Sequence, residues 1–146
     1  MQQLANNTTA FTFKGYRILE IKLNNIDTIE DSSFTINFAP DGIYYSSNNI
    51  FKLILEIEIH LGEETNNCLL SLKVEANFQF DESIKNHTEI PSFFYKNSIA
   101  IIFPYIRAFI STISLQANIK PIILPLLNLS SLETQFKENT VTNNTI

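Results

Sequence analysis

The feature that most constrains the fold of this chain is a pair of long segments in which every second residue is apolar. The first spans residues 50–61 and the second residues 70–80, and the polar residues 62–67 make up most of the short link between them. A period of two places alternate side chains on opposite faces of a β-strand, so each segment predicts a strand with one buried face. Because the link is short, we expect the two strands to be antiparallel neighbours. The apolar positions are Phe51, Leu53, Leu55, Ile57, Ile59 and Leu61 in the first segment, and Leu70, Leu72, Val74, Ala76, Phe78 and Phe80 in the second.

Two shorter segments upstream show the same alternation. The apolar residues are the odd-numbered ones in residues 19–23 and the even-numbered ones in residues 34–38, so each predicts a further strand. Pro40, Asp41 and Gly42 follow the second of these segments. These residue types favour a turn, so we expect the chain to reverse there.

The pattern changes to a helical one after Pro91. Over residues 92–115 the apolar residues recur three or four positions apart, which predicts a long helix. Pro104 lies inside it and is expected to kink the helix or start a new turn, because proline has no backbone donor. Asn118 is expected to end the helix in the left-handed conformation that glycine usually supplies.

The remainder of the chain predicts an extended segment and a second helix. Residues 119–129 are apolar and contain Pro121 and Pro125, which excludes both a regular helix and a central strand. A short helix is expected over residues 132–138. The predicted class is therefore α+β, with a four-stranded antiparallel sheet followed by two helices. We expect one domain over residues 11–137 and disordered tails over residues 1–10 and 138–146.

Charge and cysteine content limit the possible partners. The net charge is −5 and no cluster of Lys and Arg occurs, which argues against a nucleic-acid partner. The single cysteine, Cys68, cannot form an internal disulfide, and the polar start of the chain does not resemble a signal peptide. No uninterrupted apolar run reaches the roughly 18 residues of a membrane span. We expect a cytoplasmic protein without membrane insertion.

Nothing in the sequence predicts catalysis. The chain has only three glycines and no phosphate-binding loop motif. His60 lies near Glu56 and Glu58, and a His/Glu pair two residues apart can bind a metal in principle. Two ligands do not make a site, however, and no second histidine lies nearby in the sequence, so no metal site is predicted. Cys68 has no neighbouring basic residue to activate it. We therefore expect no enzyme activity, no metal and no cofactor.

Apolar residues make up 45% of the chain and charged residues only 17%, with 12 Phe and 5 Tyr. A chain this small cannot bury so much apolar surface alone, which predicts an oligomer interface or a binding groove. The alternative for each aromatic residue is ordinary core or subunit contact, and the alternation of Phe78 and Phe80 favours the core. The candidate groove residues are Phe34, Phe38, Tyr44, Tyr45, Phe78, Phe80, Phe94, Tyr95, Ile119, Ile122, Leu124 and Leu127.

Two motifs resemble the SecB export-chaperone family. Leu61-Gly62-Glu63-Glu64-Thr65 is similar to the family's link between its third and fourth strands. Ile102-Phe103-Pro104-Tyr105-Ile106-Arg107 resembles its FPY-x-R motif in the first long helix. The proline-rich stretch before Asn128-Leu129 resembles its loop into the last helix. The resemblance covers roughly residues 16–137.

The resemblance implies a fold, a function and a partner surface. The family is a dimer of dimers whose long helices lie between two sheets, and it binds unfolded or precursor polypeptides and passes them to the SecA motor. It implies a SecA-contacting surface at Glu20, Glu63 and Glu64. In the helix motif, Phe103, Pro104 and Tyr105 are expected to be structural, and Arg107 to form a salt bridge or a subunit contact.

The same family leaves a second function open. Asn24 and Ser71 stand where the resemblance implies acidic SecA-contacting residues, and Gln116-Ala117-Asn118 stands where glycines are usual. Some family members serve a single dedicated client, such as an antitoxin. The alternative to a general holdase is therefore a dedicated chaperone for one partner, without SecA docking.

Overall fold

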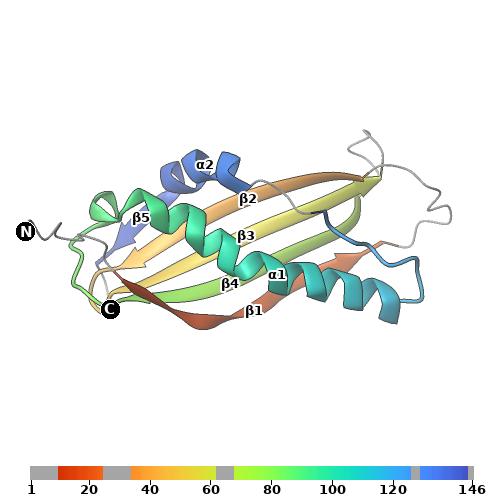
Figure 1. Ribbon diagram of the computed structural model, residues 1–146, viewed down its shortest axis with the longest axis horizontal. Coiled ribbons are helices and arrows are strands. Elements are labelled where there is room, and N and C mark those ends of the chain that lie inside the picture. Colours follow the sequence, from red (N-terminus) through yellow and green to blue (C-terminus); the bar gives the residue numbers. More distant parts are fainter. Residues whose placement is uncertain (1–9, 25–33, 62–67, 126–128, 145–146) are drawn as a thin grey trace, which may run out of the picture.

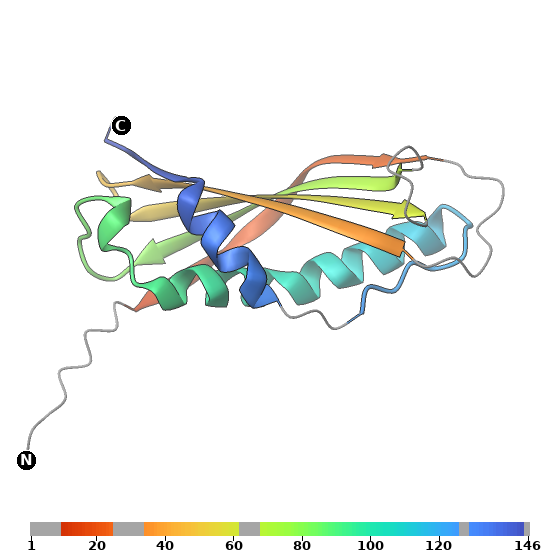
Figure 2. The same ribbon diagram turned by 90° about the horizontal axis from the view of Figure 1, so that it is seen from above.

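The computed structural model describes residues 10–24, 34–61, 68–125 and 129–144. They form one curved sheet with both α-helices on the same face (Figures 1 and 2). The predicted α+β class is confirmed, and the long predicted helix and the strand over residues 50–61 have nearly the bounds expected. The elements are β1 (Phe11–Leu23), β2 (Phe34–Tyr45), β3 (Ile50–Leu61), β4 (Cys68–Phe80), a 3₁₀ turn η1 (His87–Glu89), α1 (Ser92–Gln116), a 3₁₀ turn η2 (Leu129–Leu132), α2 (Glu133–Glu138) and β5 (Thr140–Asn143).

The sheet is mixed and five-stranded, in the order β1-β4-β3-β2-β5. The four-stranded antiparallel prediction is wrong in one respect, because β5 adds to β2 in parallel over residues 42–45. The strand lies inside the segment 138–146 that was predicted to be a disordered tail. Four residues of Thr, Val and Asn are too short and polar for a periodic signal, and the strand forms because the end of β2 offers it a partner.

β1 is longer than predicted and carries two irregularities. Its register to β4 shifts between Phe13 and Gly15 and again between Ile18 and Glu20. The second shift leaves Leu19 as an extra residue, so Ile18 and Ile21 reach the same face although they are three positions apart. Gly15 has a φ of 114° at the first shift, a conformation that favours glycine. Simple alternation over residues 19–23 therefore misassigns Leu19.

β2 continues straight through the predicted turn at Pro40-Asp41-Gly42. The reversal comes later, at residues 46–49, where Asn49 has a φ of 59°. Pro40 is tolerated because its nitrogen lies on the outer side of β2, where the β2–β3 ladder needs no donor. Gly42 is required for space, since a Cβ there would overlap the Phe51 ring and lie 2.6 Å from Thr140 Oγ1.

α1 is continuous across Pro104. The proline cannot donate to the carbonyl of Ala100, but both residues are exposed, so solvent can reach that carbonyl. The helix ends as predicted, with Asn118 at a φ of 60°. The N–H of Ile119 then donates to Ser114 O at 3.2 Å.

The core lies between the helices and the inner face of the sheet. Every residue from the two alternating apolar sets of β3 and β4 is buried. The Phe94 ring of α1 lies at the centre, 4.7 Å from the Phe51 ring, 5.5 Å from Phe78 and 4.9 Å from Phe80. Burial of each such side chain contributes about 1.5 to 3 kcal/mol, so this layer holds α1 on the sheet.

Candidate functional site

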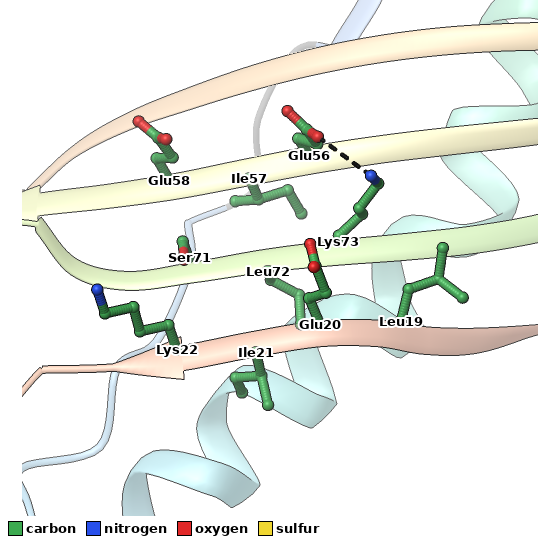
Figure 3. A pocket seen from close by; sticks show the side chains of 10 residues that line it. All are labelled: Leu19, Glu20, Ile21, Lys22, Glu56, Ile57, Glu58, Ser71, Leu72 and Lys73. Atoms are coloured by element: carbon green, nitrogen blue, oxygen red, sulfur yellow. Dashed lines mark ion pairs between the residues drawn. The ribbon is translucent and has the colours of Figure 1, made fainter.

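The outer face of the sheet, opposite the helices, carries a shallow charged hollow of about 700 Å³. Figure 3 shows its side chains on β1, β3 and β4. Glu20 lies opposite Lys73 in the β1–β4 register, and Lys73 Nζ lies 3.7 Å from Glu56 Oε1. The lining residues are Leu19, Glu20, Ile21, Lys22, Glu56, Ile57, Glu58, Ser71, Leu72 and Lys73.

The residues that the resemblance implied for SecA docking are only partly described. Glu20 and Ser71 line the outer-face hollow together. Asn24 is half-buried at the end of β1, and its Nδ2 donates to Cys68 O at 2.8 Å. Glu63 and Glu64 lie outside the described residues. Exposed side chains of both charges are suited to a solvated docking surface.

Glu75 forms the most buried ionic contact on the outer face. Its side chain binds Arg17 Nε at 2.5 Å and Lys52 Nζ at 3.3 Å, and the residue is only 4% exposed. Burial raises the pKa of this carboxyl, but the hydrogen bonds from Arg17 and Lys52 outweigh it and hold the pKa below its usual value. The contact thus ties β1 to β4 and β3.

A different kind of site lies at the outer edge of β2. Gly42 N donates to Asn139 O and Ser46 N donates to Asn143 O, both at 3.3 Å, so the backbone groups of even-numbered residues point away from β3. Alternate residues of an antiparallel strand point their backbone groups to the same side. The N–H and C=O groups of Phe34, Ile36 and Phe38 therefore point outward. No described residue pairs with them. We call these three residues the β2 edge.

The side chains of the β2 edge are apolar. Phe34 is 36% exposed, and Ile36 and Phe38 are half-buried against the core. The Phe38 ring lies 6.3 Å from the Phe103 ring of α1. Backbone groups that no described residue pairs and at least partly accessible apolar side chains thus occur together on one strand edge, which is the arrangement that accepts a further extended segment.

A second apolar region lies on the exposed side of α1. A hollow of about 500 Å³ is lined by the C-terminal half of the helix and by the segment that returns along it. Ser111 Oγ donates to Ile122 O at 3.0 Å and Ile122 N donates to Ser114 Oγ at 3.1 Å, which holds the segment against the helix. The residues of this helix hollow are Pro104, Arg107, Ala108, Ser111, Thr112, Leu115, Pro121 and Ile123.

The candidate groove residues fall into two groups. Phe34 is exposed, and Phe38, Tyr45 and Ile119 are half-buried, so these four are accessible. Leu127 lies outside the described residues. The proline-rich segment was expected to form a groove wall with Ile122 and Leu124, but both are 1% exposed, and the outward side chain is Ile123 at 64%. The buried candidates are Tyr44, Phe78, Phe80, Phe94, Tyr95, Ile122 and Leu124.

The helix motif has a mixed environment. Phe103 is buried, whereas Tyr105 is exposed and stacks its ring 5.1 Å from that of Tyr16 on β1. Arg107 was expected to form a salt bridge or a subunit contact. It makes no ion pair with a described residue and lines the helix hollow. The subunit contact stays a prediction.

Sequence reasoning missed the exposed apolar residues Leu115 and Ile123. Leu115 does not belong to the buried stripe of α1, which ends near Ile110 and Ser114, so a helical projection would have identified it. Ile123 had no such signal. In an extended segment its neighbours Ile122 and Leu124 point the other way, and only packing decides which of them is buried.

The described residues hold no group of three or more His, Cys, Asp or Glu side chains that could bind a metal ion. Burial, and then the charge of Glu58, raise the pKa of the Cys68 thiol, so its reactive thiolate is disfavoured. α1 is long and apolar enough, by length and composition alone, to cross a membrane. In this fold one side of the helix packs on the sheet, and 39% of its most apolar 18-residue window is buried.

The fold has a counterpart among solved structures. It is similar to that of the SecB-like chaperone Rv1957 of Mycobacterium tuberculosis, solved in complex with a ChAD peptide from the Rv1956 HigA1 antitoxin. The TM-score is 0.65 at 13% identity, covering 81% of this chain and 88% of that one. The fold is thus SecB-like.

A curated relative places the chain in a family. It is 34% identical over 136 residues to the uncharacterized protein MJ0357 of Methanocaldococcus jannaschii, covering 88% of this chain and 86% of that protein. The chain belongs to the same family as MJ0357. The comparison with protein-family models finds no match.

Proposed function

We propose that this protein is a SecB-like chaperone that holds unfolded or precursor polypeptides in extended form on the β2 edge. The observation that carries the proposal is the coincidence of outward backbone groups and apolar side chains at Phe34, which is exposed, and at Ile36 and Phe38, which are half-buried. An added strand would gain hydrogen bonds from the edge and would place alternate side chains beside these residues. Such holding is driven by binding alone and needs no reaction, nucleotide, metal or cofactor.

Self-association belongs to the same proposal. Leu115 at the end of α1 and Ile123 on the segment beside it are both exposed, and exposed apolar side chains of this size are typical of subunit contacts. A dimer of dimers that buries the helix hollow agrees with the family resemblance of the helix motif. In this arrangement Arg107 would meet a second copy. We propose the reducing cytoplasm as the compartment, and delivery to SecA through the outer-face hollow.

A dedicated chaperone for one partner is the second candidate. The structural neighbour Rv1957 was solved with a peptide from an antitoxin. In this chain, Ser71 and Asn24 replace the acidic residues that the resemblance implies for SecA docking, and Ser71 lies in the outer-face hollow itself. Loss of negative charge there favours a function in which the client is bound and not passed on.

Light scattering tests the proposal. A chemically unfolded, unrelated protein is diluted into buffer with and without this chain, and the molar mass of the chain is measured in the same sample. Suppressed aggregation by a tetramer-sized species is expected for a general holdase. If the well-folded chain does not suppress aggregation, it is not a general holdase. Pull-down of one specific client would then favour the dedicated chaperone.

A matched pair of variants connects the activity to the β2 edge. Ile36→Pro removes an outward N–H that makes no ladder bond to β3, whereas Ile36→Ala shortens the side chain and keeps the N–H. We expect Ile36→Pro to lose more suppression than Ile36→Ala. Equal activity of the two variants would show that clients bind elsewhere, without deciding whether the chain is a holdase.

A further inference from the structure

We infer that β5 is a built-in stop that limits the length of the polypeptide segment bound at the β2 edge. This inference rests on the proposed function and concerns the same site. β5 pairs with the outer side of β2 over residues 42–45, directly in line with the β2 edge. β5 therefore occupies the backbone N–H and C=O groups of β2 with which a longer client segment would have to pair.

The first residue of the segment containing β5 to bind the outer side of β2 is Asn139. Its carbonyl accepts from Gly42 N at 3.3 Å, and its side-chain Nδ2 donates to Pro40 O at 3.4 Å. From Gly42 to Tyr45 the outer side of β2 is paired with β5. The stretch of β2 whose outward backbone groups, those of Phe34, Ile36 and Phe38, meet no described partner spans about six residues or about 20 Å of extended chain.

β5 is held by side chains as well as by its ladder. Thr142 Oγ1 accepts from His87 N at 2.8 Å and lies 2.5 Å from His87 Nδ1. Ser46 Oγ donates to Asn144 Oδ1 at 2.6 Å. Thr140 is buried, and its hydroxyl donates to Phe136 O at 2.7 Å. Both ends of the strand are thus anchored, so a client segment must end at the stop or displace it.

The substrate class follows from this geometry. The site takes a segment of about six residues with large apolar side chains at alternate positions, because only those positions fall beside Phe34, Ile36 and Phe38. A longer β-prone segment gains nothing from its additional residues. The full chain is therefore selective for short apolar runs flanked by polar sequence.

Two variants remove the stop in different ways. Truncation after Glu138 deletes β5 together with Asn139. Val141→Pro keeps the length and removes the N–H that the alternation places toward β2, while Val141→Ala keeps that N–H. The Val141 side chain is 55% exposed, so its loss in either variant costs little packing. Circular dichroism and thermal unfolding check that each variant is folded.

The test measures fluorescence anisotropy of two labelled peptides, with alternating Val and Thr over about six and about twelve residues, each flanked by lysines. The full chain and Val141→Ala are expected to bind both peptides equally. The truncated chain and Val141→Pro are expected to bind the longer peptide roughly tenfold more tightly than the shorter one.

Two outcomes would overturn the inference, and they differ in what they say of the proposed function. If the full chain already prefers the longer peptide, or if folded stop-free variants show no preference, β5 is not a stop and the proposed function stands. If neither peptide binds any of the proteins, binding at the β2 edge fails as well.

Discussion

The Phe38 ring on β2 lies 6.3 Å from the Phe103 ring on α1. Phe103 belongs to the helix motif that resembles the SecB family, and Phe38 belongs to the proposed binding edge. The helix motif thus supports β2, because the buried Phe103 ring fills the space between α1 and the inner face of this strand. Changes at Phe103 should affect both stability and the order of the edge.

Phe103→Ala is expected to lower the free energy of unfolding by about 3 to 5 kcal/mol, because it leaves a cavity under β2. Urea denaturation followed by circular dichroism measures the change. Tyr105→Ala is the control, since the Tyr105 ring is 46% exposed and loses only its contacts with the rings of Tyr16 and Phe13 at the surface. An equal loss in both variants would contradict the assigned packing.

Leu124→Asp and Ile123→Asp should differ in their effects on folding. Leu124 is buried, so a carboxylate there is expected to cost more than about 3 kcal/mol or to prevent folding. Ile123 is exposed, so its replacement should change the free energy of unfolding by less than about 0.5 kcal/mol. Thermal melts and molar mass report on folding and assembly. A smaller oligomer for Ile123→Asp, with the fold intact, is expected if the helix hollow is a subunit contact.

Glu75 should make the protein sensitive to acid. Because the pKa of Glu75 is lower in the folded chain than its ordinary value, the unfolded state takes up the proton first as the pH falls. The stabilisation is therefore complete above the ordinary carboxyl pKa and is lost as the pH falls through the lowered value. Glu75→Gln should cost roughly 1 to 2 kcal/mol at neutral pH, with Arg17 and Lys52 partly solvated.

The measurement for Glu75 is the free energy of unfolding of both proteins from neutral pH to strongly acidic pH. The difference between them should shrink as the pH falls. A difference that stays constant over this range would show that the carboxyl is not held ionised by Arg17 and Lys52.

Asn118→Gly is expected to stabilise the protein by up to about 1 kcal/mol, because glycine adopts the left-handed conformation without a Cβ penalty. Asn118→Ala should destabilise by about 1 kcal/mol for the opposite reason. Midpoints of thermal unfolding compare the three proteins. The reverse order would mean that the Asn118 side chain contributes more than its backbone conformation costs.

Much of the fold follows from local patterns. The alternation in residues 50–61 and 70–80 predicts β3 and β4 together with the buried face of each, and the three-to-four spacing after Pro91 predicts α1. Asn118 ends the helix as its type predicts. These signals are reliable because the period of buried side chains depends only on the local backbone geometry.

The rest depends on contacts between distant segments. Pro40 and Gly42 read locally as a turn, but they lie inside β2 because Phe51 and Thr140 pack over Gly42 from elsewhere in the chain. The candidate site was located only in part. Phe34 and Phe38 are on the accessible edge, whereas Ile122 and Leu124 are buried, and no local pattern decides which face of an extended segment is covered.

The sequence by itself determined the class of the fold, its two central strands and its long helix, since each has a period that only one backbone geometry satisfies. Only the tertiary structure decided that residues 140–143 become a fifth strand and that, among the described residues, none pairs with the outward backbone groups of Phe34, Ile36 and Phe38. The physical reason is that a strand edge is defined by which backbone groups other segments leave without a partner, and this is a property of the assembled sheet.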